Sequence, residues 1–183
     1  MTALSSPADT ERYDGATMAL HWLTAFLVIA LFALAQTWPF LERGSDGRHF
    51  LQWTHISLGV TLAAVIVLRG VWRVTGGDHL PPPYGGALGL AAKLSHWGLY
   101  LLLLAQIVLG FLFAWVGGPI DVFGLFHVPV LIDVGRANVR TVAEIHETVA
   151  WVIIALAGLH ALAALVHHYG WRDGVLRRMW PSA

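Results

Sequence analysis

Four stretches of this chain contain no Asp, Glu, Lys or Arg, and they limit its fold more than any other feature. They run from Gly15 to Leu41, His49 to Leu68, Leu94 to Ile120 and Thr148 to Trp171, and are 20 to 27 residues long. A transmembrane helix needs about 20 mainly apolar residues to cross the hydrocarbon core of a bilayer. The sequence therefore predicts an all-α integral membrane protein, a bundle of four membrane-spanning helices.

The composition agrees with a membrane protein and excludes several other classes. Only 12% of the 183 residues are charged, against about 25% in an average soluble domain. A soluble bundle would need a polar helix face, and Leu99 to Phe113 offers none. Eleven basic residues balance eleven acidic ones, so charge gives no reason to expect a nucleic-acid partner. The absence of cysteine excludes disulfides, thiolate metal sites and covalently attached haem.

Prolines and glycines separate the expected helices. Trp38-Pro39 ends the first, Thr75 to Gly89 carries three consecutive prolines and two Gly-Gly pairs, and Gly117-Gly118-Pro119 ends the third. We expect helices at about 16–38, 50–73, 92–116 and 143–169, within a single membrane domain over residues 1–183. The longest connection, Pro119 to Val142, has room for a short interfacial segment.

The distribution of basic residues predicts the orientation. With both termini in the cytoplasm, seven of the eleven Lys and Arg residues lie on the cytoplasmic side and four outside. Cytoplasmic loops carry an excess of these residues, so this orientation is favoured. The inner set is Arg12, Arg69, Arg73, Lys93, Arg172, Arg177 and Arg178, and the outer set is Arg43, Arg48, Arg136 and Arg140.

The chain has ten histidines, and several lie within the expected spans, where an ionisable side chain is costly and usually functional. His146 and His160 are fourteen residues apart, so they share one helix face at depths about 21 Å apart. His21 is expected at the depth of His160, near the inner surface. His55 is expected at the depth of His146, near the outer surface. The spacing therefore predicts two His–His pairs.

Imidazoles from facing helices can bind the two axial positions of a haem iron in a bundle core. Small residues that leave room for a flat porphyrin lie one turn or less from three of these histidines: Gly59, Ala150 and Gly158. Two other interpretations stay open. The histidines could be hydrogen-bonded across small-residue helix contacts in a non-redox scaffold. Alternatively, His96, His160, His167 and His168 could hold zinc near the inner edge.

Several motifs, in order along all four helices, resemble those of the bacterial cytochrome b561 family. They are Ala19-Leu20-His21-Trp22-Leu23, His55-Ile56-Ser57-Leu58-Gly59, His96 with Tyr100, His146-Glu147-Thr148, Leu159-His160-Ala161, Val166-His167-His168-Tyr169 and the tail Trp171-Arg172-Asp173. Each motif is weak alone, but together they are specific. The resemblance implies a four-helix bundle of the bacterial inner membrane with two haem b groups in its core.

The resemblance also implies particular roles for residues. His21 with His160 and His55 with His146 would be the axial ligands of the two haem irons. The activity implied is that of a superoxide oxidase, in which superoxide gives its electron at the periplasmic face and ubiquinone is reduced near the cytoplasmic face. His167 would contact ubiquinone, with His168 facing lipid headgroups. Arg69, Arg73 and His96 are possible helpers on the same side.

A second function fits the same helices. A cytochrome b subunit could pass electrons between quinone and a hydrogenase- or dehydrogenase-type partner, with the segment from Pro119 to Val142 as a partner surface. The outer segments contain six carboxylates beside their four arginines, so the sequence shows no net basic surface that would attract superoxide. A haem spectrum and a superoxide-dependent quinone assay separate these functions.

Overall fold

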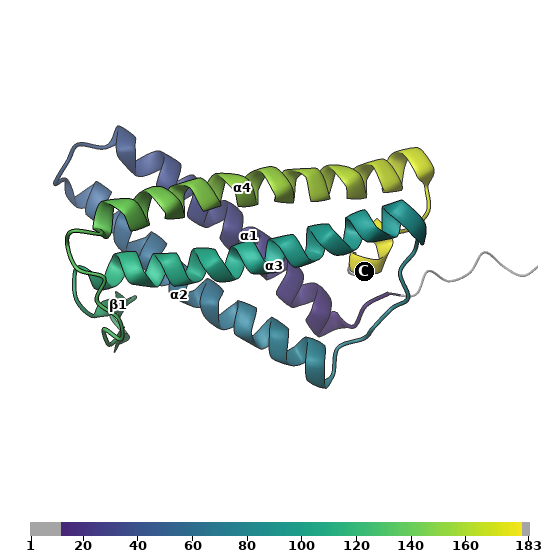
Figure 1. Ribbon diagram of the computed structural model, residues 1–183, viewed down its shortest axis with the longest axis horizontal. Helices are drawn as coiled ribbons and strands as arrows, with labels where there is room; N and C mark the ends of the chain where they lie inside the picture. Colours follow the sequence, from purple (N-terminus) through teal and green to yellow (C-terminus); the bar gives the residue numbers. More distant parts are fainter. Residues whose placement is uncertain (1–11, 181–183) are drawn as a thin grey trace, which may run out of the picture.

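The computed structural model describes residues 12–180, which form four long helices running back and forth along one axis (Figure 1). They are α1 (Gly15–Thr37), α2 (Asp46–Thr75), α3 (Gly86–Trp115) and α4 (Val139–Leu165). All four are long and apolar enough to cross a membrane, so the predicted four-helix membrane fold is confirmed. The outermost parts of the domain expected over 1–183, residues 1–11 and 181–183, lie outside the described residues.

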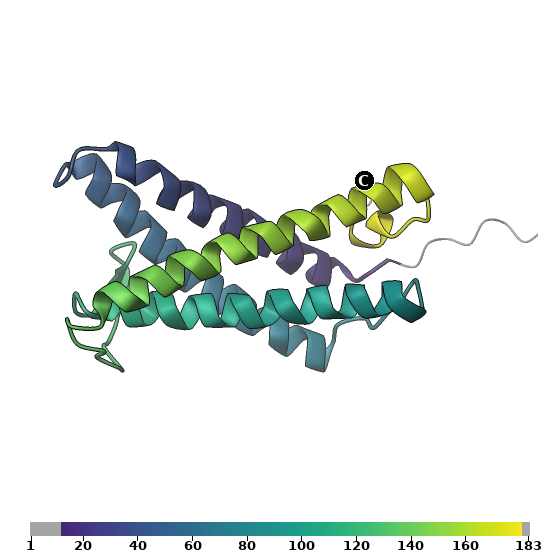
Figure 2. The ribbon, with the colours of Figure 1, turned by 45° about the horizontal axis from the view of Figure 1, so that its top comes forward.

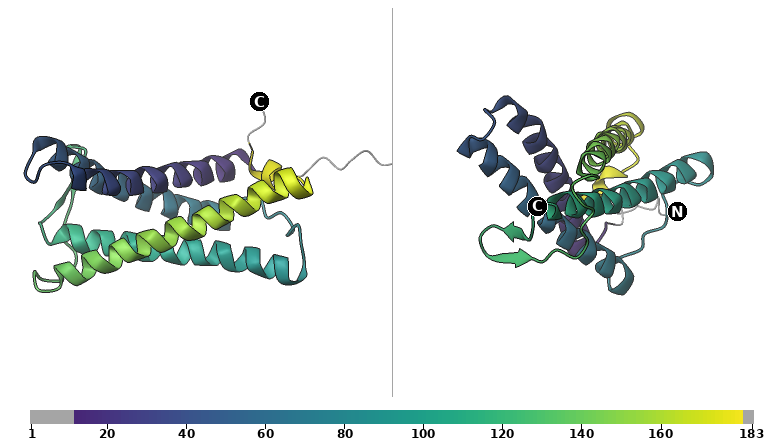
Figure 3. Two further views of the ribbon diagram at one scale, coloured as in Figure 1. Left: turned by 90° about the horizontal axis from the view of Figure 1, so that it is seen from above. Right: turned by 60° about the vertical axis from the view of Figure 1, so that its left-hand side comes forward.

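Both ends of the described chain lie at the same end of the bundle, which we call the terminal end (Figure 1). At the opposite end, which we call the hairpin end, strands β1 (Ile120–Val122) and β2 (Phe126–Val128) pair antiparallel, with Asp121 opposite His127. Figure 3 shows this hairpin projecting to the side of the bundle near this end, where it packs against α2. Phe123 and Gly124 both have positive φ, 52° and 69°, which the tight turn between the strands requires. The hairpin lies in the segment where the sequence predicted an interfacial element.

Three helices begin four to six residues earlier than the charge pattern predicted, and one of them is α4, which was expected from about residue 143 and begins at Val139. The second was expected from about residue 50, but Ser45 caps α2 by accepting a hydrogen bond from the Arg48 N–H, and the favourable acidic residue Asp46 occupies the first turn. The third was expected from about residue 92, but α3 begins at Gly86, directly after the proline-rich connection. The charge pattern indicates where a helix enters the hydrocarbon region of the membrane. The first residue of the helix is set by the capping residues, which can lie several residues earlier.

The last helix changes geometry near its end. Regular α-helix stops at Leu165, and Val166–Trp171 (η2) continues as a π-helix. Arg172 then takes a left-handed conformation with φ 55°, and the short 3-10 helix η3 (Leu176–Met179) follows. π-helical turns often occur at functional sites because they redirect side chains relative to a regular helix. Here the change affects His167 and His168.

The helices pack as two antiparallel pairs, α1 with α2 and α3 with α4, which cross at an angle (Figure 2). The main hydrophobic core lies midway along the bundle and takes one or more residues from each helix: Leu27, Leu62, Val65, Leu103 and Ile153. Many other large apolar side chains face outward, including Phe26, Leu101 and Leu159, each more than 60% exposed. In a bilayer this surface contacts acyl chains, so its exposure is expected for helices of this composition.

Candidate functional site

The first histidine pair lies near the hairpin end. The ring centroids of His55 on α2 and His146 on α4 are 6.4 Å apart. Nδ1 of His55 lies 3.0 Å from the carbonyl oxygen of Leu31 on α1. A carbonyl only accepts, so Nδ1 carries the proton and Nε2 keeps its lone pair for a ligand. The ring of Trp38 packs edge-on against His55 at 5.1 Å and limits its rotation.

His146 is held by α3. Its Nε2 lies 3.0 Å from the amide nitrogen of Gln106, and a Cβ atom added at Gly110 would approach its Cε1 to 3.3 Å. Two buried polar atoms here, Nδ1 of His146 and Oε1 of Gln106, have no hydrogen-bond partner. Buried polar atoms are nearly always satisfied, so unpaired ones mark a place where a bound group can complete the site.

The second pair lies toward the terminal end and differs in its surroundings. The ring centroids of His21 on α1 and His160 on α4 are also 6.4 Å apart, and His96 on α3 lies 5.3 Å from His160. Nη2 of Arg69 lies 3.2 Å from Nδ1 of His21, and its guanidinium stands 5.2 Å from the Tyr100 ring. A guanidinium only donates, so Nδ1 of His21 accepts and Nε2 carries the ring proton; Nε2 is free for a metal only when Arg69 releases Nδ1. This pair therefore has a permanent cation beside it.

Apolar side chains separate the two pairs. Ile153, which is 3% exposed, is seven residues from both His146 and His160, or about 10 Å of helix from each. Leu27, Leu62 and Leu103 surround it from the other three helices. The core therefore fills the space between the pairs with closely packed hydrocarbon. Water cannot easily link the two histidine sites through this region.

The separation of the rings in both pairs fits a haem iron. An imidazole nitrogen lies about 2 Å from the metal that it binds, so two rings on opposite sides of one ion have centroids about 6 to 6.5 Å apart. Both observed separations agree. A Cβ added at Gly59 would meet nothing within 4 Å, so there is free space beside α2 near His55. Gly158 is exposed and lies on the other side of α4 from His160, so it does not provide such space. Among residues 12–180, no three His, Asp or Glu side chains converge as a zinc site would need.

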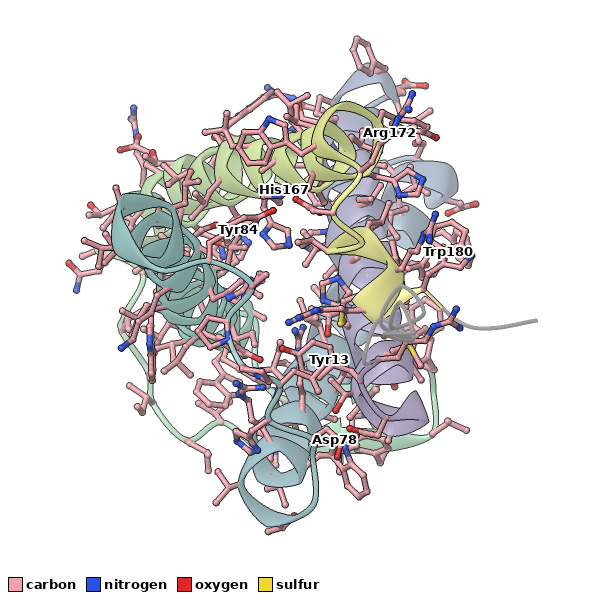
Figure 4. The ribbon with its side chains drawn as sticks, turned by 90° about the vertical axis from the view of Figure 1, so that its right-hand side faces the viewer. Tyr13, Asp78, Tyr84, His167, Arg172 and Trp180 are labelled. Carbon is pink, nitrogen blue, oxygen red and sulfur yellow. The ribbon has the colours of Figure 1, made fainter. Side chains whose placement is uncertain are left out.

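A third group of polar residues surrounds His167 in the π-helix. Nδ1 of His167 lies 2.5 Å from Oδ2 of Asp173, and the Tyr84 hydroxyl donates to the same oxygen. The His167 ring also contacts Tyr84 at 5.2 Å and Trp171 at 4.4 Å. The side chains of His167 and Asp173 are only 16% and 17% exposed. Figure 4 shows Tyr84 and His167 facing each other between the ends of α3 and α4.

Asp173 is the centre of this group. Burial acts to raise its pKa, but hydrogen bonds from Tyr84, His167 and the Val175 N–H hold the pKa of Asp173 below its usual value. The same contact raises the pKa of Tyr84, because its hydroxyl donates to the Asp173 carboxylate. Asp173 is therefore ionised at neutral pH and fixes the proton of His167 on Nδ1.

The structure brings His21 to His160 and His55 to His146, and it places His167 in a separate group. Of the expected helpers, Arg69 and His96 contact the terminal-end pair. Arg73 makes no hydrogen bond or ion pair with the side chains described here, and the His168 ring packs on Tyr169.

Sequence reasoning missed Gln106, Tyr84 and Asp173. Gln106 had a signal, since it is the one polar side chain in the apolar run from Leu101 to Ala114. Asp173 stood in the tail motif Trp171-Arg172-Asp173 but was given no role, and Tyr84 had no signal, because the two lie in separate connections that only the folded chain brings together.

The hairpin fixes the rotation of α2. Trp53 and Ser57 share one face, and both bind the hairpin: the Trp53 indole donates to Oδ1 of Asp121, and Ser57 Oγ accepts from the Phe123 N–H. Ser57 is fully buried. His55 lies between them in sequence, so it projects to the opposite side of α2, toward α1 and α4. The contacts of Trp53 and Ser57 with the hairpin therefore determine the direction in which His55 points.

Comparison with known proteins gives consistent relatives. A family profile described as prokaryotic cytochrome b561 matches residues 12–182. Cytochrome b561 homolog 2 of Escherichia coli (strain K12) is 36% identical over 171 residues, covering 92% of this chain and 91% of the relative. The probable superoxide oxidase CybB of Yersinia pestis is 30% identical over 182 residues, covering 94% and 97%. Cytochrome b561 homolog 1 of Escherichia coli (strain K12) is 30% identical over 174 residues, covering 93% and 98%.

Proposed function

The chain belongs to the prokaryotic cytochrome b561 family, and from that premise we propose that it is a superoxide:ubiquinone oxidoreductase with two haem b groups. The family confirms the resemblance seen in the sequence and implies a membrane cytochrome b that binds haem b. The observation that carries the finer proposal is the pairing of four imidazoles at two depths, with His167 beyond the pair at the terminal end. The name of the Yersinia pestis relative supports superoxide as the electron donor.

The four paired histidines are the proposed axial ligands. His55 and His146 would hold one haem toward the hairpin end, and His21 and His160 the other toward the terminal end. Bound haem supplies one-electron redox chemistry at its iron. The protein's own part is to fix the imidazoles: Leu31 orients His55 with its Nε2 lone pair free, and Gly110 packs against the His146 ring. The contacts of Gln106 with His146 and of Arg69 with His21 would shift when those rings bind iron. Such partners outside the metal ligands set both geometry and potential.

The quinone site is proposed around His167. Asp173 binds Nδ1 of His167, which leaves Nε2 to face a quinone carbonyl. The carboxylate holds the ring in one orientation, so that Nε2 is positioned to exchange a proton with that carbonyl. Reduction of ubiquinone to ubiquinol takes two electrons and two protons. Two superoxide ions supply the electrons and leave as two molecules of oxygen, and the protons come from the side of the membrane that His167 faces.

The orientation follows from this assignment and from the basic residues. The terminal end, with Arg69, Arg172 and Arg177, is proposed to face the bacterial cytoplasm, and the hairpin end the periplasm. At the hairpin end two arginines are already engaged: Arg140 pairs with Glu144 at 2.8 Å, and Arg48 donates to the Leu41 carbonyl. Electrostatic attraction of superoxide at this end therefore depends on few free charges. The rate of superoxide oxidation should change little with salt concentration.

One observation favours the second candidate, a cytochrome b subunit of a larger complex. Apolar side chains stand out at the hairpin end, with Leu125 78% and Leu131 72% exposed. Exposed apolar patches beyond the spans are typical of a protein or membrane contact. A hydrogenase- or dehydrogenase-type partner could bind there and exchange electrons with quinone through this chain.

Purified protein tests the proposal in two steps. A reduced-minus-oxidised spectrum should show a b-type haem band, with two haems per chain. Superoxide and excess ubiquinone should then reduce the haem and produce ubiquinol, with heat-denatured protein as the control. Absence of haem would leave only the scaffold interpretation. Normal haem content with no superoxide-dependent quinol formation would discard superoxide as the donor and favour the subunit.

A further inference from the structure

A hollow lies beside the end of α4, apart from the histidine pairs. It is lined by His168, Tyr169, Arg172, Gly174 and Arg177. The chain reverses direction here, because Arg172 and Gly174 both have positive φ, 55° and 80°. This reversal brings η3 back against the π-helix, so that Arg172 and Arg177 reach the same hollow.

The hollow is positively charged. Within the described part of the chain, neither Arg172 nor Arg177 has a carboxylate within 4.0 Å. The oxygens of the adjacent Asp173 accept hydrogen bonds from Tyr84, His167 and the Val175 N–H and form no ion pair with either arginine. In Figure 4, Arg172 lies on the outer side of the turn, away from Tyr84 and His167. The side chains of Asp173 and Arg172 thus point in different directions.

The hollow also lies at the depth of lipid headgroups. The fourth membrane span ends at Trp171, directly beside it. Tyr169, Trp171 and Trp180 are each more than half exposed around it. Exposed Trp and Tyr side chains of this kind mark the interface between hydrocarbon and water. Toward the membrane centre, α4 and the π-helix expose Leu162 (56%) and Val166 (44%).

We infer that this hollow binds the phosphate of an anionic phospholipid headgroup, of the phosphatidylglycerol class. The two guanidinium groups supply forked donors that match phosphate oxygens, and the Tyr169 hydroxyl and the His168 ring supply further donors. The acyl chains of the same lipid would lie along Leu162 and Val166. Basic pockets at the cytoplasmic ends of membrane helices bind anionic lipids through the same interactions. The inference does not depend on the redox function.

Lipid retention tests the site. The full haem-loaded protein is reconstituted in nanodiscs of phosphatidylcholine containing a minor fraction of phosphatidylglycerol, extracted in mild detergent, and analysed for bound lipid by native mass spectrometry. The wild type should retain one phosphatidylglycerol in preference to phosphatidylcholine. Arg172→Gln and Arg177→Gln should each weaken this preference about fivefold, and the double variant about 25-fold, since each basic group near an anionic lipid contributes roughly 1 kcal/mol.

Arg178 provides the matched control. It lies on η3 beside Arg177, but its guanidinium donates to the Pro81 carbonyl at 2.8 Å, outside the hollow. Arg178→Gln removes the same charge and should keep the preference for phosphatidylglycerol. The haem spectrum of each variant reports whether the bundle is intact, and Arg172→Lys serves if Arg172→Gln does not fold.

Three outcomes would overturn the inference. Equal retention of phosphatidylglycerol by the wild type and the double variant would show that the hollow does not bind it. Displacement of the lipid by millimolar inorganic phosphate would indicate a site for free phosphate. Displacement by a short-chain ubiquinone would assign the hollow to the quinone site.

Discussion

The two histidine pairs have the same ring separation but different electrostatic surroundings. Around His55 and His146 the partners are neutral, namely a backbone carbonyl and the Gln106 amide. Around His21 and His160 a permanent cation, Arg69, and a third imidazole, His96, are added. A nearby positive charge favours the form of a redox centre that has gained an electron. If the proposed haems are bound, this difference would favour electron movement from the hairpin end to the terminal end, because Arg69 lies beside only the His21–His160 pair.

The largest expected effect comes from removing ligands, and it tests whether the pairs are independent. His55→Ala or His146→Ala should lower the haem content from two per chain to one, and the two variants should lose the same spectral component. His21→Ala and His160→Ala should lose the other component. The haem-to-protein ratio with low-temperature spectra measures this. If the His55 and His160 variants lost a common component, the assignment by pairs would be wrong.

The next effect concerns only the terminal end. Asp173→Asn should keep both haems but slow quinone reduction by about 10- to 100-fold, because His167 loses the carboxylate that orients its ring. Tyr84→Phe should give a smaller loss, since it removes one of three hydrogen bonds to Asp173. Reduction of haem by superoxide at the hairpin end should be unchanged in both, measured in the absence of quinone. A matching loss in that half-reaction would show that Asp173 supports the whole bundle.

Arg69→Gln tests the charge difference directly. A unit charge about 8 Å from a redox centre contributes about 2 kcal/mol at an effective dielectric constant near 20, which is roughly 90 mV for one electron. The substitution should lower the midpoint potential of the terminal-end haem by this order and leave the other haem unchanged. Arg73→Gln, one turn further along α2, is the control. Redox titration with equal shifts in both haems would contradict the proposed asymmetry.

A smaller effect is expected from crowding at the hairpin end. In Gly110→Ala the new Cβ would lie 3.3 Å from Cε1 of the His146 ring, and such overpacking costs about 1 to 3 kcal/mol, partly offset by the better helix propensity of alanine. The hairpin-end haem should shift in spectrum or bind less firmly. Gly98→Ala is the matched control, because its new Cβ would lie at the same distance, 3.3 Å, from Cδ2 of Leu156. That methyl group can move, so the control should leave both haems unchanged.

The smallest effect concerns the hairpin that braces α2. Hydrogen bonds from the Gly124 N–H and the Trp53 indole hold the pKa of Asp121 below its usual value. Because the pKa is lowered in the folded protein, ionised Asp121 stabilises the fold. This stabilisation is present above the carboxyl's unfolded pKa of about 3.9 and is lost as the pH falls through the folded value. Asp121→Asn should slightly lower thermal stability at neutral pH and remove this acid dependence. If the acid dependence of thermal stability were unchanged in Asp121→Asn, a titrating group other than Asp121 would be its cause.

The sequence alone determined the number of helices, their approximate positions and the depths of the histidines. Each follows from distances along one helix: charges stop where hydrocarbon begins, and His146 and His160 share a face because fourteen residues is nearly four turns. Only the tertiary structure decided what stands beside each pair. Arg69 reaches His21 because of how α2 is rotated and packed, and Tyr84 reaches Asp173 because two connections meet at the terminal end. The rise and periodicity of a helix fix the depth and the face of a residue within that helix. The rotation of each helix in the bundle and the paths of the loops depend on packing between segments far apart in the chain.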